Sequence, residues 1–333
     1  MPTVHHGAQL HAREHAFGST GTIAVAALVG SALALGATVL NFERDAARER
    51  RDRTQRASAL VEDAFDLLES EQAAPTPWRR AEPSLSIADR QRLVQARRKI
   101  DRAVALDPEN ASARRALGLV MAEQGSADQA VAELERAIAL EPRVAAAYYN
   151  LGNSFLRLGR PAEAAEAYRR VIEYEPNHPH AHTGLGSALR ALGKLDEAIA
   201  EYQRAIEIAP SQPFAYYGLG SAYQSQKQWD VAIEQYRKAI ERAPDYIAAL
   251  SDLGDALAAT GRLDEAVVQY RRALAIAPTY VPALAGRGEA LVRASHVEEG
   301  VADLRRAVEL DSDWDQPRAA LARALALTAT ARR

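Results

Sequence analysis

A period of 34 residues runs through most of this 333-residue chain and constrains its fold more than any other feature. Glycines recur at this interval, an alanine follows each of them twelve residues later (a glycine in the last unit), and prolines close every unit but the sixth. The glycines are Gly118, Gly152, Gly186, Gly220, Gly254 and Gly288; the small residues are Ala130, Ala164, Ala198, Ala232, Ala266 and Gly300; the prolines are Pro142, Pro176, Pro210, Pro244 and Pro278. Such self-similarity is typical of repeat proteins, in which each unit rests on its neighbours.

Apolar residues inside each unit have helical spacing. In the second unit they recur at intervals of three and four residues, which predicts two amphipathic helices. Gly159 and Gly193 follow the first helices of their units and permit the positive φ that is common at helix ends. The closing proline lacks an N–H group and therefore ends the second helix. The apolar positions of the second unit are Leu151, Phe155, Ala164, Tyr168 and Val171.

These units resemble tetratricopeptide repeats. The stretches YYNLGNSF and EAAEAYRRVIEYEP match the family's order of a bulky residue, Leu-Gly, an aromatic residue, Ala, an aromatic residue and Pro. Six full units run over 111–144, 145–178, 179–212, 213–246, 247–280 and 281–314. The resemblance implies an all-α fold, a right-handed superhelix (α-solenoid) of antiparallel helix pairs over residues 111–314.

The regions that flank these six units carry weaker forms of the same pattern. Residues 57–110 read as a degenerate helical pair, with a proline-rich loop over 73–84 between its helices. Residues 315–333 read as a capping helix and a tail, because the last repeat of a solenoid needs its apolar end covered. Arg287 and Gly300 replace the usual leucine and alanine of the sixth unit, which predicts looser packing there.

The amino-terminal region differs from the repeats in composition. No charged residue occurs from Ala16 to Phe42, and the run from Ile23 to Leu40 is long enough to cross a bilayer as a helix. We therefore predict a flexible tail over 1–20, a transmembrane helix over 21–42 and a basic juxtamembrane segment over 43–56. The alternatives are a cleaved signal peptide, for which residues 32–34 offer a cleavage site, and a buried core helix.

Basic residues set the expected orientation of this helix. Arg13 is the only lysine or arginine upstream, whereas six arginines lie in the segment 43–56. The positive-inside rule then places the repeats in the cytoplasm, with the periplasm as the alternative. Small residues four apart, Ala26, Gly30 and Ala34, could bring two copies together as a homo-oligomer, although alanine-rich runs produce this spacing by chance.

The resemblance also implies where ligands bind, since first helices line the concave face of such a superhelix. Inward places carry aromatic and neutral polar residues in the middle repeats and acidic ones toward the carboxyl terminus, a surface suited to a protein or peptide ligand. The candidate groove residues are Arg115, Tyr149, Asn150, Asn153, His180, Thr183, Ser187, Arg190, Phe214, Tyr217, Ser221, Gln224, Asp252 and Asp255. The inward places of the fifth and sixth units also include Ser251 and Glu289.

The histidines at 178, 180 and 182 raise the question of a metal site. Pro179 starts a helix after His178, and His180 and His182 then point about 200° apart, so the three do not face one ion. The chain has no cysteine, which excludes disulfides and cysteine-bound metals. We expect no metal and no cofactor. The net charge of −3 gives nucleic-acid binding little support.

Together these patterns predict a membrane-anchored scaffold or adaptor that holds partners for the assembly of a complex. No phosphate loop, nucleophile elbow or metalloprotease helix occurs, so the chain is not expected to be an enzyme. An exported periplasmic protein of envelope biogenesis or secretion and a non-catalytic subunit of an enzyme complex are the alternatives. The abundance of alanine and arginine points to a bacterium with GC-rich DNA.

Overall fold

The computed structural model describes residues 38–67 and 87–331. The chain divides into two compact units, residues 1–57 and 58–333. In the first unit, residues 38–57 are helical and mostly exposed. The predicted tail, most of the predicted transmembrane helix and the proline-rich loop over 73–84 lie outside the described residues. Across the described ranges, no helix is both long and apolar enough to cross a membrane.

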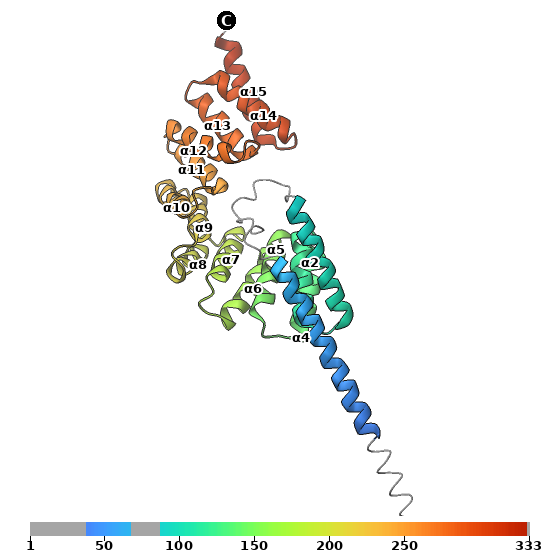
Figure 1. The fold of residues 1–333 in the computed structure, drawn as a ribbon. Helices are drawn as coiled ribbons and strands as arrows, with labels where there is room; N and C mark the ends of the chain where they lie inside the picture. Colours follow the sequence, from blue (N-terminus) through green and yellow to red (C-terminus); the bar gives the residue numbers. More distant parts are fainter. Residues whose placement is uncertain (1–37, 68–86, 332–333) are drawn as a thin grey trace, which may run out of the picture. The chain divides into compact units, whose positions relative to one another are not determined.

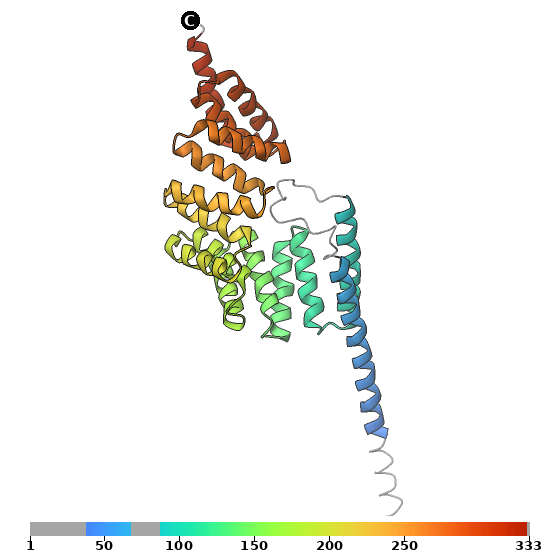
Figure 2. The ribbon, with the colours of Figure 1, turned by 60° about the vertical axis from the view of Figure 1, so that its left-hand side comes forward.

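The second unit consists of stacked helix pairs (Figures 1 and 2). Residues 58–67 are helical, and the later helices are α2 (Ile87–Leu106), α3 (Ala111–Glu123), α4 (Ala127–Leu140), α5 (Ala145–Arg157), α6 (Pro161–Tyr174), α7 (Pro179–Ala191), α8 (Leu195–Ile208), α9 (Pro213–Ser225), α10 (Trp229–Arg242), α11 (Ile247–Ala259), α12 (Leu263–Ile276), α13 (Val281–Arg293), α14 (Val297–Leu310) and α15 (Asp315–Ala331). The described residues contain no β-strand. The predicted all-helical repeat solenoid is confirmed.

Turns inside the repeats follow from the residues at the helix ends. Gly193, between α7 and α8, has a φ of 76°, in the left-handed region that glycine enters without strain. Lys227 stands at the same place of the fourth repeat and has a φ of 61°. The helix packing on both sides therefore imposes this turn even on a residue with a Cβ atom.

Tyrosines on the second helices fill the centre of four repeats. Tyr168, Tyr202, Tyr236 and Tyr270 are almost fully buried. Each packs on the glycine of its own first helix. An ideal Cβ atom on Gly186 would lie 2.8 Å from Cε1 of Tyr202, which is too close for any side chain. The ring lies between the two helices of the repeat and supplies the nearest neighbours of Gly186.

The first and sixth repeats carry leucine where the middle repeats carry tyrosine. Leu134 and Leu304 are fully buried and sit against Gly118 and Gly288. In the sixth repeat, the guanidinium of Arg287 donates two hydrogen bonds of 2.6 Å to the carboxylate of Asp303, which joins α13 to α14. This bidentate pair links the two helices at the place of the missing leucine.

Both ends of the second unit are covered by further helices. Val301 and Leu304 of α14 pack with Ala320 and Ala324 of α15. At the other end, Ala96, Ile100 and Ala103 of α2 are fully buried. The apolar faces of the end repeats are thus protected from water, as a solenoid requires.

Candidate peptide-binding groove

A hollow of about 430 Å³ lies along α5, α7 and α9, the first helices of three successive repeats. Nine predicted groove residues line it: Tyr149, Asn153, His180, Thr183, Ser187, Arg190, Phe214, Tyr217 and Ser221. Six further residues complete the wall: Leu156, Tyr168, Gly184, Tyr202, Gly218 and Tyr246. The hollow therefore has the size of a small-ligand or side-chain pocket, and aromatic rings make up a large part of its wall.

Aromatic rings at its wall pack on the buried tyrosines behind them. The ring of Tyr149 meets that of Tyr168 edge-on, with centroids 6.0 Å apart, and the centroid of Tyr217 lies 5.8 Å from that of Tyr236. Tyr149 and Tyr217 are therefore half-buried parts of the wall, supported by the core on one side and open to the hollow on the other.

Polar residues at the ninth place of the first helices bind the tyrosine hydroxyls of their own repeats. The hydroxyl of Tyr168 donates to Oδ1 of Asn153 at 2.6 Å. Ser187 donates its own hydrogen to the carbonyl of Thr183, so it accepts from the hydroxyl of Tyr202 at 3.1 Å. The hydroxyl of Tyr270 donates to Oδ1 of Asp255 at 2.5 Å, and Oγ of Ser221 lies 3.3 Å from the hydroxyl oxygen of Tyr236. These polar groups are partly committed to the fold, because buried hydroxyls need partners.

Sequence reasoning missed this pairing because the partners are 15 residues apart and on different helices. The sequence nevertheless holds a correlation that indicates the pairing. The four repeats with tyrosine on the second helix carry a polar residue (Asn, Ser, Ser and Asp) at the ninth place, whereas the first repeat has Leu119 there and Leu134 in place of the tyrosine. Gly184 and Gly218 also belong to the wall, although their lack of side chains made them look uninvolved.

Charge in the groove is sparse. Among the described residues that line the hollow, Arg190 is the only lysine or arginine, and none is a carboxylate. Burial and the neighbouring His178 lower the pKa of His180, which favours its neutral form.

A carboxylate lies beside the hollow, outside its lining. The hydroxyl of Tyr217 donates to Oδ2 of Asp252 at 2.9 Å. Burial, followed by the charge of Asp255, raises the pKa of Asp252 to about 7.

Five predicted residues lie outside the hollow. Arg115 lies over the ring of Phe65, with its guanidinium carbon 5.0 Å from the centroid. Gln224 accepts a hydrogen bond of 2.9 Å from the hydroxyl of Tyr236. Asn150, Asp252 and Asp255 belong to α5 and α11 but not to the lining.

Each histidine of the cluster has a different environment. Nδ1 of His178 accepts a hydrogen bond from the backbone N–H of Ala181 and caps α7. His182 is buried, with Nδ1 2.7 Å from the Glu201 carboxylate and Nε2 3.0 Å from the Pro176 carbonyl. Both partners are acceptors, so only the doubly protonated ring satisfies them, and the Glu201 contact raises the pKa of His182.

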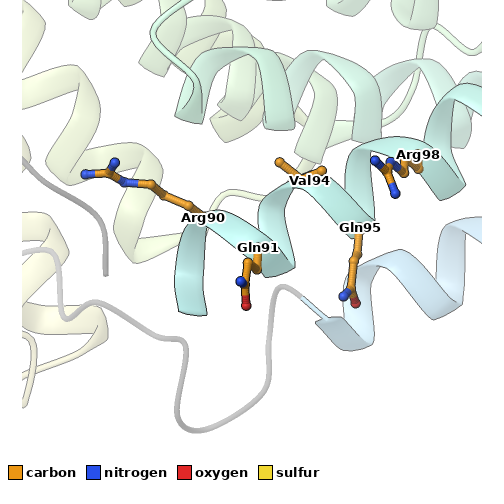
Figure 3. A pocket seen from close by; sticks show the side chains of 5 residues that line it. All are labelled: Arg90, Gln91, Val94, Gln95 and Arg98. Atoms are coloured by element: carbon orange, nitrogen blue, oxygen red, sulfur yellow. The ribbon is translucent and has the colours of Figure 1, made fainter. Parts of the chain in front are cut away.

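A second hollow lies on the surface of α2 (Figure 3). Its described lining consists of Arg90, Gln91, Val94, Gln95 and Arg98, which all belong to this one helix. No predicted groove residue is among them. The hollow along α5, α7 and α9, which draws on three repeats, is the stronger candidate site.

Comparison with protein-family models supports the assignment from the repeat pattern. Models described as tetratricopeptide repeat match residues 88–145, 122–173, 149–213 and 211–279, which together span more than half of the chain. The chain belongs to the tetratricopeptide repeat family. No curated protein matches it.

Solved structures show the same fold. A chain of the APC/C hetero-tetramer Cut9-Hcn1 is 15% identical with a TM-score of 0.64, and the match covers 82% of this chain but only 53% of that one. A tetratricopeptide repeat protein from Parabacteroides merdae is 16% identical over 81% of this chain and 99% of its own, with a TM-score of 0.60. PilF from Pseudomonas aeruginosa is 18% identical over 65% and 98%, with a TM-score of 0.56. At such identities the likeness establishes the fold alone.

Proposed function

We propose that this protein is a scaffold whose hollow along α5, α7 and α9 binds a peptide segment of a partner protein. Its fold is that of protein-interaction scaffolds. The observation that carries the proposal is the hollow itself, in which half-buried aromatic rings alternate with hydroxyl, amide and imidazole groups from three repeats. Aromatic anchors beside polar groups are the usual composition of a peptide-binding surface.

Filling the hollow provides the test. Thr183 is half-buried and lines it, so Thr183→Trp should occupy the space and weaken peptide binding at least about tenfold. Gln203→Trp, at an exposed position of α8 outside the lining, is the matched control. Binding of fluorescent peptide pools to the full chain can be followed by anisotropy. Equal binding by both variants would place the ligand elsewhere.

We propose in addition that residues 21–42 anchor the chain in a membrane with the repeats in the cytoplasm, where the scaffold supports the assembly of a complex. The uncharged run from Ala16 to Phe42 and the six arginines of segment 43–56 support this. The full chain should then stay with membranes after an alkaline carbonate wash, whereas a chain that begins at Ala57 should be released. A reporter active only in the periplasm, fused after Arg333, should remain silent; reporter activity would reverse the orientation.

A further inference from the structure

The fifth repeat departs from its neighbours beside the hollow. At the sixth place of the first helix, Gly184, Gly218 and Gly286 leave room for the tyrosine ring of the preceding repeat. An ideal Cβ atom on Gly184 would lie 2.5 Å from Cζ of Tyr168. The fifth repeat has Asp252 at this place. The packing of the repeat favours glycine here, so it does not account for the carboxylate.

The surroundings of Asp252 compensate its charge poorly. Among the described residues, its hydrogen bond comes from the neutral hydroxyl of Tyr217, and no cation lies within ion-pair distance. A half-buried anion with one neutral donor loses more hydration than it regains, so an added cation would stabilise it. The ionisable groups around it are Arg190 of α7, Tyr217 of α9, Tyr236 of α10, Tyr246 and Asp255 at α11, Tyr270 of α12 and Tyr280 before α13.

Aromatic rings connect this carboxylate to the hollow. Tyr217 of α9 and Tyr246, which precedes α11, both line the hollow, and their ring centroids are 4.9 Å apart. Tyr217 also holds Asp252 by its hydroxyl. The faces of tyrosine rings attract cations, and a carboxylate beside them adds a full opposite charge.

From this juxtaposition we propose that Asp252 sets the specificity of the groove for a peptide carrying a lysine or arginine side chain. The alkyl part of that side chain packs on Tyr217 and Tyr246, and its charge pairs with Asp252. The inference rests on the proposed peptide-binding function and adds the chemistry of the ligand. Because the pKa of Asp252 is raised to about 7, a cation that binds at lower pH must displace a proton.

Peptide pools of defined charge test the inference on the full chain. Acetylated and amidated octapeptides carry no terminal charge, and one central residue is fixed as arginine, lysine, citrulline, norleucine or glutamate while the others are random. The arginine and lysine pools should bind about tenfold more tightly than the citrulline pool at pH 7.5. The preference should shrink at pH 5.5, where the carboxyl group is protonated.

Matched variants separate this carboxylate from the general charge of the protein. Asp252→Asn should abolish the preference for arginine over citrulline and leave the affinity of the norleucine pool unchanged. Asp264→Asn, at an exposed position in the first turn of α12, removes the same charge and should keep the preference. Equal binding of the arginine and citrulline pools by the unmodified protein would overturn the inference but leave the groove proposal standing. If no pool binds at all, both are contradicted.

Discussion

The four middle repeats and the two end repeats solve the same packing problem with different side chains. The middle repeats place Tyr168 and its equivalents between their helices, and each hydroxyl reaches a polar residue on the concave face. The end repeats use Leu134 and Leu304, which have no polar group to satisfy. The middle repeats therefore link core and groove through hydrogen bonds, whereas the end repeats only seal the stack. Some polar residues of the groove therefore act as hydrogen-bond partners of buried tyrosine hydroxyls.

Overpacking a middle repeat should have the largest effect. Gly186→Leu forces a side chain into the space of the buried Tyr202 ring, and we expect the free energy of unfolding to fall by about 4 kcal/mol. Hydrogen exchange should show lost protection over residues 145–246, because each repeat rests on its neighbours. Gly288→Leu in the sixth repeat should confine the loss to the carboxyl-terminal end. Unchanged protection in the Gly186 variant would mean that the ring moves aside at little cost.

Truncating the groove rings should affect binding and stability together. Tyr149→Ala combined with Tyr217→Ala should weaken peptide binding at least about tenfold. Because both rings pack on buried tyrosines, we also expect the free energy of unfolding to fall by about 3 kcal/mol, measured by urea denaturation. A melting temperature that stays unchanged would show that the rings serve the ligand alone.

A double-mutant cycle measures the link between core and groove directly. Tyr168→Phe removes the hydroxyl that donates to Asn153, and we expect a loss of about 1 kcal/mol in the free energy of unfolding. Asn153→Ala should add little once the hydroxyl is gone, which gives a coupling energy of similar size. Tyr223→Phe, at a half-buried position of α9 whose hydroxyl makes no hydrogen bond to the described residues, is the control and should change stability less. If the free-energy changes of the two single variants simply add in the double variant, the hydrogen bond does not contribute to stability.

The smallest expected effect is a pH dependence at His182. Its folded-state pKa is raised by Glu201, so its stabilisation is present below the unfolded pKa of about 6.5 and is lost as pH rises through the folded value. The stability difference between the natural protein and His182→Asn should therefore shrink from pH 5.5 to pH 8.5. His180→Asn should show the opposite trend, because burial lowers the pKa of His180. Parallel curves for all three proteins would contradict both assignments.

The 34-residue period was sufficient to predict the helix pairs, and the resemblance to tetratricopeptide repeats, which implies the inward places of each unit, led to nine residues that line the hollow. The sequence could not show that Asn153 faces Tyr168, since this contact depends on how two helices rotate against each other. The membrane segment over 21–42 remains a prediction, because most of it lies outside the described residues.

Within the second unit, each described helix packs on the helices next to it or next but one along the stack. Such an array behaves mechanically as springs in series, in which every joint between repeats bends independently of distant ones. A ligand seated across α5, α7 and α9 would bridge two of these joints and stiffen them. The joints beyond α11 would keep their compliance, so the stiffening of the bound segment would fade over one or two repeats.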